Sequence, residues 1–191
     1  MRLTILDRGH KLRTKALLTV IGLMSRHPVV DAVKLALYRP DFYRAGPLTQ
    51  EAMRGPSDWS VADRELMAAY VSNVNRTEFC ILAHTATSAM AYGDEATVTA
   101  VLADLDSAPV QEPLRSTLRI LGKLTRDNSV APDDVRAALS AGASPQQIRD
   151  ALAVAFAFNV TDRLADTFGF AVDDRAAIQA GAKYLLARGY G

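Results

Sequence analysis

The chain has 191 residues, of which 49% are hydrophobic and 23% charged, and its formal net charge at pH 7 is +1. This composition is ordinary for a globular protein, and the length fits one compact domain with an added N-terminal segment. A net charge near zero provides no long-range attraction to nucleic acid or to an anionic membrane, so we expect neither as a partner. The single cysteine, Cys80, excludes an intramolecular disulfide and is compatible with a reducing, cytoplasmic location.

Helical periodicity extends through nearly the whole chain, and Gly or Pro separates segments of helical length. The sequence therefore predicts an all-α protein, a helical bundle with an N-terminal helical arm. We expect helices over residues 11–26, 29–38, 48–53, 61–73, 78–92, 94–104, 112–126, 132–141, 145–158, 161–168 and 173–188.

The loosest segment covers residues 39–59, which contain three prolines and two glycines. It predicts a division between an N-terminal arm with its loop, residues 1–56, and a core, residues 57–191.

The residues before several predicted core helices explain chemically why those helices start there. The Ser60 hydroxyl can cap the helix that begins at residue 61, with Asp63 adding a negative charge in its first turn. Ser144 and Gln147 form the pattern of a capping box.

The candidate site is built around Cys80. His84 follows one helical turn later, and Glu65 lies on the preceding predicted helix. In the first turn of a helix, free amides and the helix dipole favour a thiolate. His84 is placed to accept the thiol proton or to protonate a leaving group. Glu65 can orient the imidazole if the helices over residues 61–73 and 78–92 pack antiparallel.

Structural explanations for the same residues stay open. A lone cysteine often behaves as a small buried hydrophobic residue, and a lone histidine on a helix often satisfies a local hydrogen bond. The Cys-x3-His spacing alone therefore does not decide whether these two residues have a catalytic or a purely structural role.

The stretch from Arg64-Glu65-Leu66 to Cys80-Ile81-Leu82-Ala83-His84 resembles the alkyl hydroperoxidase D-like group of the carboxymuconolactone decarboxylase superfamily. The signature of that group is a Glu, then Cys-x-x-Cys, then a His after three more residues. Glu65, Cys80 and His84 fit its spacings without a gap. Further stretches, 121–126, 142–148 and 158–166, are similar to later parts of the family, so that residues 57–169 are covered. The resemblance implies the helical fold of this group.

One position departs from the family pattern, because Thr77 stands where the first motif cysteine is expected. A threonine hydroxyl cannot form the disulfide through which Cys-x-x-Cys members cycle. Cys80 matches the cysteine that the resemblance expects to meet peroxide. We expect Thr77 to cap the following helix. The candidate pocket residues are Phe79, Asn159 and Arg163, although Arg163 has Asp162 and Asp166 nearby and is expected to form a local ion pair.

Three functional hypotheses follow from the residues and the resemblance. The first is a one-cysteine peroxidase, a peroxiredoxin-type oxidoreductase in which Cys80 reduces an organic hydroperoxide, Glu65 and His84 relay protons, and an external thiol restores Cys80. The second is acid/base chemistry of the carboxymuconolactone decarboxylase type, in which Cys80 only lines the pocket. The third is a non-catalytic helical oligomer with an inert, buried Cys80.

No cofactor is expected, since the sequence contains no Gly-rich phosphate loop. No metal site is expected, because the three histidines are far apart in the sequence. The resemblance implies a homo-oligomer. Residues 151–158 have no polar face and are therefore expected to be buried on all sides. The arm, with its apolar residues 17–24, either packs on its own domain or contacts a neighbouring copy.

Overall fold

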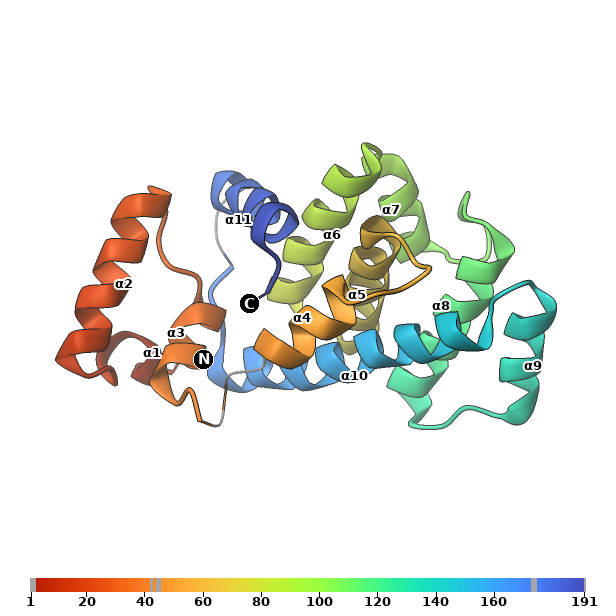
Figure 1. The fold of residues 1–191 in the computed structure, drawn as a ribbon, viewed down its shortest axis with the longest axis horizontal. Coiled ribbons are helices and arrows are strands. Elements are labelled where there is room, and N and C mark those ends of the chain that lie inside the picture. Colours follow the sequence, from red (N-terminus) through yellow and green to blue (C-terminus); the bar gives the residue numbers. More distant parts are fainter. Residues whose placement is uncertain (1–2, 42, 44–45, 173–174, 191) are drawn as a thin grey trace.

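The computed structural model of the protein describes residues 3–41, 43, 46–172 and 175–190. Their secondary structure is entirely helical, with no strand in the described residues (Figure 1). The fold class predicted from the sequence is thus confirmed. The helices are α1 (Ile5–Arg8), α2 (Leu12–Ser25), α3 (Asp31–Tyr38), α4 (Gly46–Arg54), α5 (Val61–Asn75), α6 (Glu78–Tyr92), α7 (Glu95–Ala103), α8 (Glu112–Asp127), α9 (Pro132–Ser140), α10 (Pro145–Phe168) and α11 (Arg175–Arg188).

The helix bounds agree closely with the prediction, with two exceptions among the described residues. The segments 145–158 and 161–168, predicted as two helices, form the single helix α10. Its polar residues do not interrupt it, since the side chains of Asn159 and Thr161 donate to the carbonyls of Ala155 and Ala157 one turn back, at 3.0 and 2.8 Å. The short helix α1 was not predicted. The predicted start of the last helix at residue 173 lies outside the described residues.

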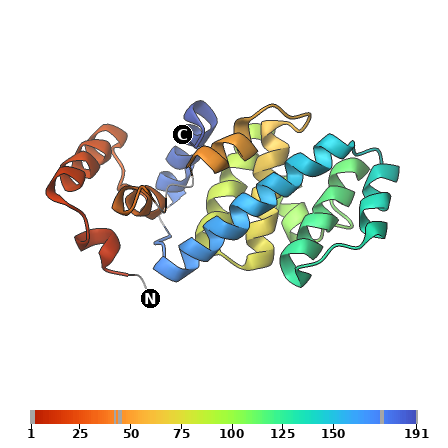
Figure 2. The same cartoon turned by 60° about the horizontal axis from the view of Figure 1, so that its bottom comes forward.

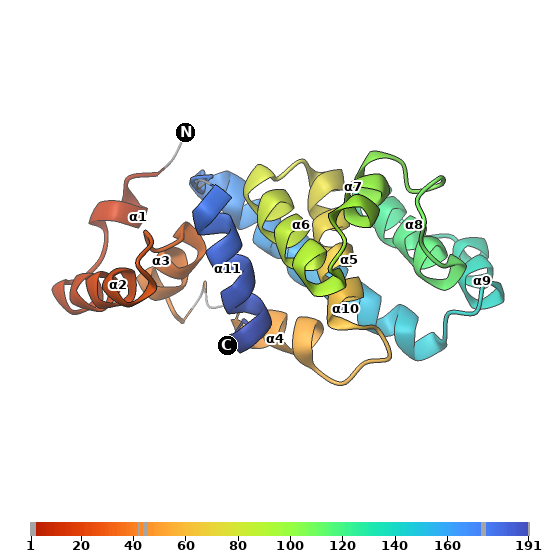
Figure 3. The same ribbon diagram turned by 90° about the horizontal axis from the view of Figure 1, so that it is seen from above.

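A hydrophobic core forms between α5, α8 and α10, to which α4 and α7 contribute. Helix α5 lies at the centre of this bundle, and α10 crosses it as one long helix (Figure 2). The largest fully buried side chains include Met53, Leu66, Leu118 and Phe158. Helix α11 returns to pack along α6 (Figure 3). These contacts fix α5 and α6 as the rigid support of the candidate site.

The N-terminal helices α1, α2 and α3 lie together at one end of the molecule, next to the end of α10 (Figure 1). Leu6, Leu35 and Phe168 form a small core there, and the Leu3 amide donates to the Phe168 carbonyl at 3.0 Å. By contrast, α4 packs on α5 and α10 and contributes Met53 to the main core. The division into residues 1–56 and 57–191 stays a prediction.

Two apolar segments are less buried than their composition suggests. In α10, Phe156 is 60% exposed, so the expectation that residues 151–158 are buried on all sides is wrong. The reason is the position of α10 at one side of the bundle, which leaves part of its surface without a neighbour in this chain (Figure 2). Helix α2 has no buried residue at all.

The helix caps predicted at Ser60 and at Ser144 are confirmed. The Ser60 hydroxyl accepts from the Asp63 amide, and the Asp63 carboxylate accepts from the Ser60 amide, both at 3.0 Å. Ser144 and Gln147 make the same reciprocal pair. Gly93 ends α6 with φ +69°, a left-handed conformation that costs glycine least. In the described part of the chain, no helix is both long and apolar enough to cross a lipid bilayer.

We expect Leu118→Ala to lower the free energy of unfolding by about 2–5 kcal/mol, because Leu118 is fully buried in α8 and its truncation leaves a cavity. Leu139→Ala on α9 is the matched control, since Leu139 is 40% exposed and loses fewer contacts. Urea unfolding of both variants measures the difference. Equal losses of unfolding free energy in the two variants would contradict the burial of Leu118 in the core.

Candidate active site

The hairpin of α5 and α6 brings Glu65 against His84. The two helices are joined by Arg76 and Thr77, and they run antiparallel, since Ser88 reaches the Ala62 carbonyl at 3.1 Å further along the same interface. The Nδ1 atom of His84 lies 2.8 Å from Oε2 of Glu65, and both side chains are buried. The antiparallel packing expected from the short turn is present.

Glu65 determines how His84 presents its ring. A carboxylate only accepts hydrogen bonds, so Nδ1 is the nitrogen that carries the proton in this pair. In the neutral imidazole, the lone pair then lies on Nε2, which makes no hydrogen bond to any described residue. The ring packs edge-on against Phe158 at a centroid distance of 4.5 Å and is therefore held in this orientation. His84 presents Nε2 as an available base.

Two residues that the sequence analysis missed complete the surroundings of Glu65. The Arg54 guanidinium at the end of α4 donates to Oε1 at 2.6 Å. The Tyr190 hydroxyl, which follows α11, donates to the same carboxylate at 2.8 and 3.0 Å. The Tyr190 ring also stacks on His84 and lies under the Arg54 guanidinium. Neither residue carries a local sequence signal, because Arg54 sits in the Pro- and Gly-rich segment and Tyr190 is far along the chain.

These contacts set the protonation of Glu65. Burial acts to raise the pKa of this carboxyl, but the hydrogen bond and charge of His84 and those of Arg54 outweigh it, and the pKa is lowered. Glu65 is therefore a carboxylate at neutral pH. Burial, followed by the charge of Glu65, raises the pKa of Tyr190 well above its usual value, so Tyr190 stays a neutral donor.

Cys80 is the third residue of α6 and is only 1% exposed. The expectation that the helix start favours a thiolate is wrong, because burial, together with Asp162 and then Asp166, raises the pKa of Cys80 well above its usual value. A helix terminus favours a charge by about 0.3–1 kcal/mol. Removing a charge from water costs several kcal/mol, and two acidic neighbours add to that cost. At rest, Cys80 is a protonated thiol.

Asp162 on α10 is a buried acidic group whose charge acts on Cys80, and it was not predicted as part of the site. Its side chain is fully buried, and it accepts hydrogen bonds from Ser72 at 2.9 Å and from Asn75 at 2.8 Å. Burial raises the pKa of Asp162 despite these donors and the charge of His84.

Thr77 occupies the N-cap position of α6, but its side chain makes no capping hydrogen bond. The expected cap is therefore wrong. Its hydroxyl instead donates to the Asp166 carboxylate at 2.8 Å, a bond to a charged acceptor that ties the start of α6 to α10.

The three pocket candidates lie away from the Glu65–His84 pair. Phe79 packs edge-on against Phe170 at 5.2 Å, and Asn159 accepts a hydrogen bond from Asn75 at 3.1 Å. Arg163 is exposed and forms no ion pair within the described residues, contrary to expectation. The reason is that Asp162 faces Ser72 and Asn75 while Asp166 accepts from Thr77.

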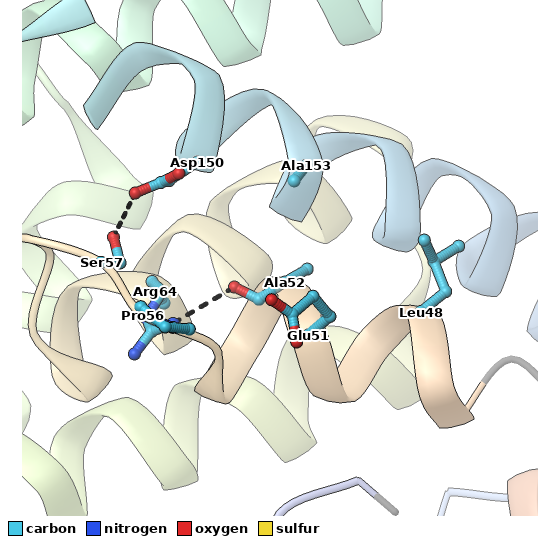
Figure 4. Close-up of a pocket in the computed structure, with 8 residues that line it drawn as sticks. All are labelled: Leu48, Glu51, Ala52, Pro56, Ser57, Arg64, Asp150 and Ala153. Carbon is cyan, nitrogen blue, oxygen red and sulfur yellow. Dashed lines mark hydrogen bonds between the residues drawn. The ribbon is translucent and has the colours of Figure 1, made fainter. Parts of the chain in front are cut away.

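A separate cavity of about 140 Å³ lies between α4, the loop before α5, and α10 (Figure 4). The Arg64 side chain borders it and donates to the Gly55 carbonyl at 2.8 Å, while Ser57 donates to Asp150 at 2.6 Å. Cys80, His84 and Glu65 are not among its lining residues. This cavity does not give access to the thiol.

The helical bundle that holds this site has the alkylhydroperoxidase D core fold, as the resemblance implied. The chain superposes with a TM-score of 0.74 on an uncharacterized peroxidase-related protein from Silicibacter sp. TM1040, at 23% identity and covering 87% of both chains. It superposes with a TM-score of 0.72 on an alkylhydroperoxidase AhpD core, an uncharacterized peroxidase-related protein from Ralstonia eutropha JMP134, at 21% identity and covering 87% and 88% of the two chains. No family model and no curated protein matches the sequence. At these identities the likeness establishes the fold.

We expect Tyr190→Phe to destabilise the protein by about 1.5–3 kcal/mol, because it removes a hydrogen bond to the buried Glu65 carboxylate. Tyr184→Phe on α11 is the matched control, since Tyr184 is 59% exposed and the same change there alters stability by less than about 0.5 kcal/mol. Urea unfolding gives both values. A Tyr190→Phe variant as stable as the control would show that the hydroxyl does not support Glu65.

Proposed function

We propose that the protein reduces organic hydroperoxides through the single thiol of Cys80, with His84 and Glu65 as the proton relay. The observation that carries this proposal is the buried His84–Glu65 pair, which leaves Nε2 of His84 as an available base one helical turn after Cys80. The alkylhydroperoxidase D core fold, shared with two peroxidase-related proteins, supports the same chemistry.

The reaction follows from the groups present. Nε2 of His84 accepts the thiol proton, and the sulfur attacks the terminal oxygen of the hydroperoxide. The O–O bond breaks, the sulfur becomes a sulfenic acid, and the departing alkoxide takes up a proton that Nε2 of His84 delivers. Sulfur is oxidised by two electrons and the peroxide is reduced to an alcohol.

Regeneration requires a thiol from outside the chain, because Cys80 is the only cysteine and Thr77 cannot form a disulfide. A first external thiol condenses with the sulfenic acid and releases water, forming a mixed disulfide. A second external thiol then releases Cys80. This need for thiols fits a reducing compartment such as the cytoplasm.

A second candidate function, the non-catalytic helical protein, is favoured by one observation. Cys80 is 1% exposed and its pKa is raised, as expected for an inert, buried thiol. In that case, the network of Glu65, His84, Arg54 and Tyr190 is structural. The decarboxylase-type reaction has less support, because Arg54, which lies at the site, already pairs with Glu65 rather than facing a substrate carboxylate.

The test is the mass of Cys80 after brief exposure of the reduced protein to cumene hydroperoxide with a dimedone trap. We expect a sulfenic adduct whose rate falls by about 10²–10⁴ in His84→Ala, the usual contribution of a general acid or base. His27→Ala is the matched control and keeps the wild-type rate, because His27 lies on the N-terminal arm. A thiol that stays unmodified while free cysteine is oxidised would support the non-catalytic function instead.

We also propose that the protein is a homo-oligomer, with a second copy of the chain covering the apolar surface of α2. This helix buries no residue within its own chain, although Leu12, Leu23 and Met24 are 85%, 74% and 82% exposed. Water-exposed apolar side chains gathered on one helix are typical of an interaction surface.

For the oligomer, we expect the double variant Leu23→Glu/Met24→Glu to shift the sedimentation-derived mass of the protein toward that of one chain. Introduced charges would be buried without partners at such an interface. Arg13→Glu, an exposed charge change on the same helix, is the control and leaves the mass unchanged. A wild-type protein that sediments as one chain at all concentrations would exclude the oligomer.

A further inference from the structure

The cavity between α4, the loop before α5, and α10 takes no part in the proposed peroxidase reaction (Figure 4). Its volume of about 140 Å³ equals that of about five water molecules at liquid density. The lining combines apolar surface with ionisable groups. The apolar residues are Leu48, Ala52, Pro56 and Ala153, and the ionisable ones are Glu51, Arg64 and Asp150. A cavity with this lining has the size and chemistry for a small polar ligand.

The Arg64 side chain is a buried cation without an anionic partner. It is 5% exposed and forms no ion pair with any described residue. Its Nη1 atom donates to the carbonyl of Gly55 at 2.8 Å and to that of Ala52 at 3.5 Å. Its Nε atom is buried and has no hydrogen-bond partner, and Nη2 bonds to no described residue. Since a guanidinium has five N–H donors, most of its capacity is unused.

The surroundings of Arg64 do not compensate its charge. An arginine stays protonated at neutral pH, and a buried charge is costly unless an opposite charge or hydrogen bonds replace the lost water. Burial, followed by the charge of Arg54, lowers the pKa of Arg64. The nearby carboxylate of Glu65 is already paired with Arg54 at 2.6 Å. Arg64 therefore has donors left for a carboxylate brought by a ligand, the group that a guanidinium binds best.

Two carboxyl groups of the lining make a bare anion a poor ligand. The Asp150 carboxylate accepts from Ser57 and from Gln146, both at 2.6 Å, and these donors are neutral. Glu51 on α4 is exposed, and neither acid forms an ion pair with a described residue. A simple anion would be attracted by Arg64 and repelled by both acids, and a simple cation would meet the reverse. A ligand that carries both charges suits all three groups.

We propose that this cavity binds a small zwitterion of the α-amino acid type. Arg64 binds its carboxylate, and Asp150 together with Glu51 binds its ammonium group. The volume limits the side chain to one as small as that of alanine, which lies against the apolar part of the lining. This binding function is independent of the proposed peroxidase reaction, because the cavity is lined by neither Cys80 nor His84.

The first test is isothermal titration calorimetry of the folded, full-length chain with three probes. Alanine carries both charges. Lactate has a hydroxyl in place of the ammonium group, and ethylamine lacks the carboxylate. We expect alanine to bind, and we expect lactate and ethylamine to bind at least about tenfold more weakly, because each loses one charged contact. This comparison uses the unaltered protein, so it does not depend on the folding of a variant.

Two variants then assign the charges of the ligand to the lining residues. We expect Asp150→Asn to weaken alanine binding at least about tenfold without weakening lactate binding, since the removed charge attracts an ammonium group and repels a carboxylate. We expect Arg64→Lys to weaken the binding of both, because a lysine lacks the planar pair of donors. Asp166→Asn and Arg163→Lys are the matched controls and keep the wild-type affinity, since both residues are exposed on α10 and lie outside the cavity.

Three results would overturn the proposal. The first is the absence of saturable heat with alanine, which would show that the cavity holds only solvent. The second is lactate binding as tight as that of alanine, which would show that the ammonium group is not recognised. The third is an alanine affinity that is the same in Asp150→Asn and Asp166→Asn, which would place the bound ligand elsewhere. None of these results bears on the oxidation of Cys80, so the peroxidase function is tested separately.

Discussion

The burial of the Glu65 charge is the constraint on which the rest of the site depends. A carboxylate in the interior is tolerated only if donors surround it, and here they come from three places: Arg54 on α4, His84 on α6, and Tyr190 after α11. Each contact also has a structural consequence. The Arg54 contact fixes α4 on α5, the Tyr190 contact fixes the segment after α11, and the His84 contact sets which ring nitrogen is free. The charge of one residue thereby organises both packing and chemistry.

A second buried carboxyl, Asp162, has no such cationic support, since it forms no ion pair within the described residues. The two groups respond differently to similar burial, because the pKa of Glu65 is lowered while the pKa of Asp162 is raised. Pairs of acidic groups whose surroundings separate their pKa values are a frequent basis for assigning acid and base roles. In this protein the ionised Glu65 holds His84 through a hydrogen bond, whereas burial makes the protonated form of Asp162 easier to reach than in an exposed aspartate.

Local sequence patterns were sufficient for most of the helices and for the Glu65–His84 contact, but not for the residues that surround it. The periodicity placed α6 correctly, and the short turn before it implied the antiparallel contact of Glu65 with His84. The protonation of Cys80 was predicted in the wrong direction, because the helix position is visible in the sequence whereas the burial and the acidic neighbours on α10 are not. Arg54 and Tyr190 were missed for the same reason, since long-range packing alone brings them to Glu65.

The contact between Tyr190 and Glu65 spans 125 residues of sequence. Protein chains are made from the N-terminus, and early segments begin to fold while later ones are still being synthesised. The α5–α6 hairpin therefore emerges from the ribosome long before Tyr190, whose hydroxyl is the last donor to reach Glu65. Before Tyr190 has packed, the Glu65 carboxylate lacks one of its hydrogen-bond donors, so burying its charge in the hairpin costs more free energy. Assembly of the Glu65 network is in this way coupled to completion of the bundle, because the carboxylate gains its last donor only when the end of the chain has packed.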